Sequence, residues 1–202
     1  MRYVQKHRVA VAAGVKGMTS QSLGRIEQCF WPQDFRRDVW MIADAARHPR
    51  IFAMLQELHL EYYCLYSGPL PPALEMAAPY LVHFDYDDPG THHFLQNAWG
   101  NSWGVFLKCA SHARSLRRHL REFLVMRDSD GNRLVFRYYD PRVLRVYLPT
   151  CTLEELRTFF GPIECFWVED ETSDLILDYS CDGNGLSERK HSIGQPDSTR
   201  LP

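Results

Sequence analysis

The segment from Leu134 to Pro149 constrains the fold of this chain more than any other stretch, because its expected structure changes sharply at one dipeptide. Side chains up to Tyr139 divide into two alternating sets, with the period of two that is typical of a β-strand. Asp140 is a good helix N-cap, and Pro141 suits the first helical position because its missing N–H would be unpaired there. The pattern predicts a strand, a capped turn and a short helix that ends at Pro149.

Arginine and tyrosine gather at this predicted corner, and both residue types are enriched at the hot spots of protein interfaces. Half of these residues could equally be core tyrosines and helix-surface arginines. We predict a protein-binding surface, with Asp140 and Pro141 in structural roles. Its residues are Arg137, Tyr138, Tyr139, Arg142 and Arg145.

A second basic set lies on the helix expected after Ser111, where apolar residues face inward and arginines lie mostly on the outer arc. This face could meet an acidic partner surface, and an ordinary exposed helix side is the alternative. The arginines of this second predicted binding face are Arg114, Arg117, Arg118 and Arg121.

Composition indicates a globular chain that has neither a nucleic-acid nor a membrane partner. Apolar residues make up 45% and aromatic residues 13% of its 202 residues, which is enough to bury a core. The net charge of −2 gives no bulk attraction to nucleic acid or to a membrane surface. Because we find no export signal and no apolar run of membrane-spanning length, we expect a cytoplasmic protein with reduced cysteines.

Strand and helix patterns alternate along the chain, which predicts an α/β fold (α+β is possible) with a mixed sheet and flanking helices. We expect one compact domain at residues 38–170. Residues 1–37 are expected to form a mobile arm whose Phe30, Trp31 and Phe35 could dock on the body or on a partner. Residues 171–202 are expected to form a short strand and a disordered tail.

Two patterns hint at catalysis, and neither is convincing. Asn97 to Gly104 resembles the Asn-Ser-Trp-Gly segment of papain-like proteases, but Cys29 lacks the sequence context of a papain nucleophile. We therefore expect Trp99 and Trp103 to have packing roles. The histidines and aspartates of residues 83–93 match no metal-ligand spacing, and a solvated loop is the better interpretation. We predict no metal, no cofactor and no enzymatic activity.

The chain resembles the type VI secretion effector-chaperone family most clearly at Phe136-Arg-Tyr-Tyr-Asp-Pro-Arg-Val-Leu-Arg145, followed by Leu148-Pro149-Thr150. Further pieces of the family pattern occur in order between about Val39 and Asp170. These pieces are Trp40-Met-Ile-Ala-Asp-Ala-Ala-Arg47 with Pro49-Arg-Ile-Phe52, Ala78-Pro79-Tyr-Leu-Val82, Trp99-Gly100 with Trp103-Gly-Val-Phe106, Arg118-His-Leu-Arg-Glu-Phe-Leu124 and Phe159-Phe-Gly-Pro-Ile163.

The resemblance implies a bacterial cytoplasmic adaptor that binds a secreted toxic effector and loads it onto the VgrG spike protein. Its action would be stoichiometric binding without catalysis. Two alternatives stay open at this point. One is a small metal-dependent hydrolase that uses the His83–His93 loop, and the other is an immunity protein that blocks a toxin.

Overall fold

The computed structural model describes residues 18–32, 38–127 and 130–194. Within these residues, seven strands form one sheet in the order β2-β3-β1-β4-β7-β8-β9, and two more form a separate hairpin, β5-β6. All neighbouring strands run antiparallel. The strands are β1 (Val39–Asp44), β2 (Tyr62–Cys64), β3 (Pro79–Phe84), β4 (Gly104–Lys108), β5 (Val125–Arg127), β6 (Arg133–Val135), β7 (Cys165–Glu169), β8 (Leu175–Asp182) and β9 (Gly185–Ser192).

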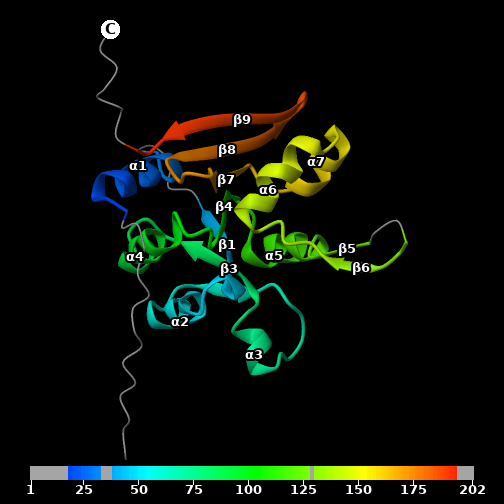
Figure 1. The fold of residues 1–202 in the computed structure, drawn as a ribbon, viewed down its shortest axis with the longest axis horizontal. Helices are drawn as coiled ribbons and strands as arrows, with labels where there is room; N and C mark the ends of the chain where they lie inside the picture. Colours follow the sequence, from blue (N-terminus) through cyan, green and yellow to red (C-terminus); the bar gives the residue numbers. More distant parts are fainter. Residues whose placement is uncertain (1–17, 33–37, 128–129, 195–202) are drawn as a thin grey trace, which may run out of the picture.

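Helices cover both faces of the large sheet, so the predicted sheet with flanking helices is confirmed (Figure 1). One buried apolar cluster joins the sheet to α1, α2 and α4, and the other joins it to α5, α6 and α7. No helix in the described part of the chain has the length and apolar character needed to cross a bilayer. The helices are α1 (Ser20–Phe30), η1 (Ala45–Arg47), α2 (Arg50–Glu57), α3 (Pro72–Glu75), α4 (Pro89–Ala98), α5 (Ala113–Glu122), α6 (Pro141–Tyr147), η2 (Leu148–Thr150) and α7 (Leu153–Phe160).

The prediction of a mobile N-terminal arm is wrong for helix α1, which is part of the core, whereas the expected docking of Phe30 and Trp31 on the body is confirmed. Ile26 and Phe30 are fully buried, and the Phe30 ring stacks on Trp167 of β7 with a centroid separation of 4.5 Å. Leu23, Ile26 and Phe30 recur at helical spacing, but a helix of 11 residues is marginal by itself, so its stability comes mainly from tertiary packing. Residues 1–17 and Phe35 lie outside the described residues.

The prediction of a disordered tail from Asp182 is also wrong for β9, which pairs with β8 along its whole length. Backbone hydrogen bonds form a strand ladder whatever the side chains are, so a polar strand can occupy the edge of a sheet. The compact unit therefore extends past the predicted boundary at residue 170. Residues 195–202 lie outside the described residues.

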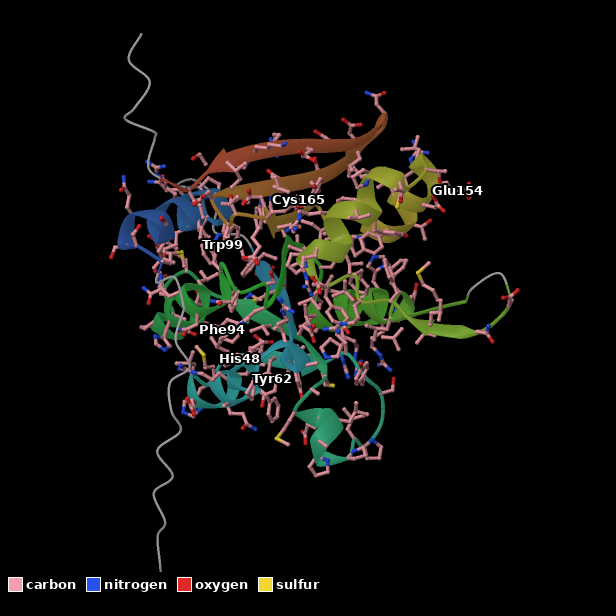
Figure 2. The ribbon with its side chains drawn as sticks, in the orientation of Figure 1. His48, Tyr62, Phe94, Trp99, Glu154 and Cys165 are labelled. Atoms are coloured by element: carbon pink, nitrogen blue, oxygen red, sulfur yellow. The ribbon has the colours of Figure 1, made fainter. Side chains whose placement is uncertain are left out.

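The tryptophan-glycine segment has the packing role that was predicted for Trp99 and Trp103, which are 4% and 5% exposed. The Trp99 ring stacks on Phe106 of β4 with a centroid separation of 5.9 Å, and Phe94 of α4 belongs to the same buried cluster (Figure 2). The Trp99 indole N–H donates to the carbonyl oxygen of Ser173 at 2.9 Å. These contacts fix the start of β4 against the β7–β8 connection.

Gly104 at the start of β4 should not tolerate a larger residue. A Cβ atom at this position would lie 2.0 Å from the carbonyl oxygen of Ile42, so the two central strands would have to separate. We expect Gly104→Ala to lower the free energy of unfolding by about 1–3 kcal/mol, the usual cost of overpacking. The matched change Gly24→Ala meets nothing within 4 Å in α1 and should raise it by about 0.5–1 kcal/mol. Urea unfolding of both variants measures the contrast, and equal effects would contradict it.

Candidate protein-binding surface

The corner between β6 and α6 differs from its prediction in where the tyrosines point. The strand ends at Val135 rather than Tyr139, so the alternation does not continue and the chain turns inward. Tyr138 is 0% and Tyr139 2% exposed, and the Tyr138 hydroxyl donates to the carbonyl oxygen of Leu120 at 2.7 Å. Burial raises the pKa of both phenols above the usual range. The prediction that these two tyrosines contact a partner is wrong, because both belong to the core.

Asp140 caps α6, which confirms its predicted structural role with Pro141 at the first helical turn. One carboxylate oxygen accepts from the Arg142 backbone N–H and from Arg142 Nε, both at 3.0 Å, and the other accepts from Arg142 Nη2 at 2.6 Å. Burial by itself would raise the pKa of Asp140, but these hydrogen bonds outweigh burial and lower the pKa. Arg142 is therefore engaged within its own helix turn.

Arg137 and Arg145 also bind the protein itself. Arg137 forms an ion pair with Asp44, a buried carboxylate at the end of β1 that also accepts from the backbone N–H of Ala46. Arg145 Nη1 donates to the carbonyl oxygen of Glu169 at 2.6 Å. These bonds hold the corner against the large sheet. The Arg137 side chain is nevertheless 45% exposed.

Arg142 and Arg145 line a surface groove of about 820 Å³ that also contains Glu188 and Lys190. Asp170 and Glu171 contribute negative charge to the same groove, so it favours neither an acidic nor a basic partner. We assign the two arginines to holding the fold, and no partner is assigned to this groove.

The basic face of α5 is divided between structure and surface. Arg117 donates from Nε to the carbonyl oxygen of Cys64 at 2.8 Å and from Nη2 to that of Tyr66 at 3.4 Å, so it anchors the end of β2. Arg114 and Arg118 are exposed and Arg121 is half-buried. Three of the four predicted arginines therefore remain available to a partner.

Arg118 and Arg121 line a groove of about 440 Å³ between α5 and the β2–β3 connection. Apolar side chains share this groove with them, Leu124 and Val125 at the start of β5 and Leu65 directly after β2. Glu122 adds one negative charge, so the two arginines leave the groove with a net positive charge. A groove with apolar side chains and guanidinium groups suits a partner segment that carries both apolar and acidic residues. The groove therefore joins the predicted basic face of α5 to the neighbouring β5–β6 hairpin.

The β5–β6 hairpin carries apolar side chains that the sequence analysis did not assign to binding. Val125 and Met126 are 40% and 41% exposed, and Leu134 and Val135 opposite them are 52% and 63% exposed. The hairpin projects from the body of the protein (Figure 1). The sequence signal for this exposed surface was the pair of consecutive apolar residues in each strand. A two-stranded ribbon that projects from the body leaves such side chains uncovered.

We call the four hairpin side chains together with Arg118 and Arg121 the hairpin surface. Val125 and Val135 lie on one face of the ribbon and Met126 and Leu134 on the other, so a partner segment must wrap the ribbon to cover all four. Clustered exposed apolar residues bordered by charge are typical of protein interaction sites.

The sequence from Val125 to Tyr139, with Asp130-Gly131 as a two-residue turn pair, also predicts a β-hairpin, which is confirmed in shortened form. The prediction of a two-residue turn is wrong, because Arg127 pairs with Arg133 and residues 128–132 connect the strands; residues 128–129 lie outside the described residues.

The histidines and aspartates of residues 83–93 are engaged separately. His83 lies 3.5 Å from Asp38 and 3.6 Å from Glu61, whereas His92 bonds Glu27 and the carbonyl oxygen of Tyr86. Among the residues the structure describes, no three His, Cys, Asp or Glu side chains are arranged to hold a metal ion.

Cys29, the cysteine that lies upstream of the papain-like segment, has the wrong environment for a nucleophile. Burial raises the pKa of Cys29 to about 12, so the thiol stays protonated at neutral pH, and it is the thiolate that attacks. Each of the six cysteines carries a free thiol.

Comparison with known proteins gives one family match. Residues 39–158, from the start of β1 into α7, match the model of a family described as a domain of unknown function, DUF4123. No curated protein and no solved structure matches the chain.

Proposed function

The chain belongs to the DUF4123 family, whose model covers more than half of its length, and from that premise we propose that it is a type VI secretion adaptor. It would bind a toxic effector in the bacterial cytoplasm and promote loading of that effector onto the VgrG spike protein. The family match begins at Val39 and spans most of the stretch whose motifs resemble the effector-chaperone family. The family match and the motif resemblance therefore concern the same part of the chain.

The exposed apolar hairpin is the observation that carries the proposal. Four large apolar side chains on one projecting ribbon are costly to leave in water, and covering them with an apolar segment of a partner removes that cost. Arg118 and Arg121 beside the ribbon would orient an acidic neighbouring segment and increase the association rate. The mechanism is stoichiometric covering of an effector segment, followed by release at the spike.

A metal-dependent hydrolase is disfavoured by the separate engagement of the His83–His93 side chains. An immunity protein would also use a binding surface, and its effect on the toxin distinguishes it. An adaptor leaves the bound toxin domain active, whereas an immunity protein abolishes the toxin's activity when the two are mixed.

Deletion of the gene in its bacterium tests the proposal. We expect export of one effector to stop while the secretion system continues to export its other substrates, and the wild-type gene should restore export. The purified effector should keep its activity when it is mixed with this protein. Unchanged export of all effectors, or inhibition of the mixed toxin, would contradict the adaptor function.

A further inference from the structure

Among the residues that the structure describes, β9 is the outermost strand of the large sheet and forms its one long open edge. The opposite edge strand, β2, has three residues, whereas β9 has eight and is the outermost strand of the sheet (Figure 1). An unpaired edge strand presents a row of backbone donors and acceptors to any strand that can align with it. The side chains of β9 then decide which strand fits.

The ladder between β8 and β9 shows which residues of β9 direct their backbone groups outward. The Ile193 N–H donates to the carbonyl oxygen of Asp174 at 2.9 Å, in the same register as the pair Leu175 and Ser192. Successive residues of an antiparallel strand alternate between forming and not forming backbone hydrogen bonds to the same neighbouring strand. Odd-numbered positions of β9 therefore bond β8, and even-numbered positions point outward. The outward positions are Leu186, Glu188, Lys190 and Ser192.

A second copy of β9 fits this edge in one antiparallel register. When a twofold axis passes through Arg189, residues 186 to 192 pair with residues 192 to 186 of the copy, and every outward position exchanges backbone bonds. Glu188 then lies opposite the partner's Lys190, and Lys190 opposite the partner's Glu188. Opposite charges directly across an antiparallel pair stabilise it. A shift to the next twofold register sets Glu188 against its own copy, or Lys190 against its own copy.

Arg189 at the axis also has its charge balanced. Its Nη2 atom donates to the buried carboxylate of Asp178 at 2.9 Å. The Arg189–Asp178 pairs of the two copies, which meet at the twofold axis, are therefore each neutral. Charged residues on an edge strand usually discourage pairing. On β9 the acidic and basic residues are spaced so that the strand complements itself.

We propose that the protein forms a twofold homodimer through antiparallel pairing of β9, which joins the two large sheets into one continuous sheet. This inference is independent of the adaptor function, because it uses an edge on a different part of the molecule from the hairpin surface.

Charge reversal on the full chain tests the dimer by sedimentation velocity. Glu188→Lys alone and Lys190→Glu alone each place like charges opposite one another and should raise the dimer dissociation constant at least about tenfold. Mixing the two single variants should restore association as a heterodimer, and the double reversal should restore the homodimer. A wild-type chain that stays monomeric at every concentration overturns the proposal, as does a mixture of the single variants that fails to associate.

A cross-link at the axis tests the register separately. Arg189→Cys places two thiols at a non-hydrogen-bonded antiparallel pair, where the Cα atoms are about 4.5 Å apart, close enough for a disulfide. Oxidation should give a covalent dimer, whereas Ser187→Cys and the wild-type chain should stay uncross-linked. Equal cross-linking of Arg189→Cys and Ser187→Cys would overturn this register.

Discussion

Replacing Tyr138 by alanine should lower the free energy of unfolding by about 3–5 kcal/mol, the range for removal of a large aromatic side chain from a core. Tyr138 is fully buried, and its ring centroid lies 5.5 Å from that of Phe159 and 6.4 Å from that of Phe123. Loss of the ring leaves a cavity between α5 and α7 that these neighbours can only partly fill. Urea unfolding at neutral pH measures the change.

The matched variant Tyr138→Phe keeps the ring and removes the hydroxyl that donates to the Leu120 carbonyl oxygen. We expect it to cost about 1 kcal/mol, the usual net value of one hydrogen bond. Tyr138→Ala with unchanged stability would show that the ring is accessible. The tyrosine would then return to the list of candidate binding residues.

Replacing Leu134 and Val135 together by aspartate should weaken effector binding at least about 100-fold, because fully burying a Leu or Val side chain contributes about 1.5–3 kcal/mol and both contributions would be lost. Both side chains are more than half exposed, at 52% and 63%. Their replacement removes little packing within the protein, so we expect its free energy of unfolding to stay within about 0.5 kcal/mol. Calorimetric titration with the purified effector measures the affinity.

The chain supplies a matched control for the hairpin at Val146 of α6, which is 70% exposed. Val135→Asp and Val146→Asp make the same change at two exposed valines in different parts of the molecule. We expect the first to weaken binding and the second to leave it unchanged. Equal affinities for the two variants would show that the hairpin surface is not the docking site.

Elements that depend on local chemistry could be predicted from the sequence. Asp140 caps α6 as expected. Thr152 and Glu155 have the sequence spacing that predicts a capping box, and they form one at the start of α7. In both cases the acceptor and the donor lie within three residues, so their spacing alone predicts the bond. Alternating strand and helix patterns likewise predicted a sheet with helices against it.

Features that depend on distant partners could not be predicted in this way. The ion pair between Arg137 and Asp44 joins positions 93 residues apart, and no local pattern indicates it. The tyrosine positions depended on where β6 ends, and one element boundary decided whether Tyr138 faced solvent or the core. Strand β9 has almost no apolar pattern and is stabilised by its pairing with β8, and the short helix α1 is stabilised by packing on β7.

The candidate site was predicted in part. Arg118 and Arg121 were assigned to a binding face from the outer arc of their helix, and the structure leaves them at a groove. The apolar hairpin was predicted as a hairpin only, because exposure of its side chains depends on how far the ribbon extends beyond the body. Which residues can contact a partner depends on their burial, and burial depends on the whole fold.

The most direct test of the adaptor function is affinity capture of the tagged protein from its own bacterium, with mass spectrometry of the bound proteins. Cells that express the type VI secretion system should yield one effector together with a VgrG protein. Both should be depleted when the tagged protein carries Val135→Asp and retained when it carries Val146→Asp. Recovery of neither protein from such cells would contradict the adaptor function.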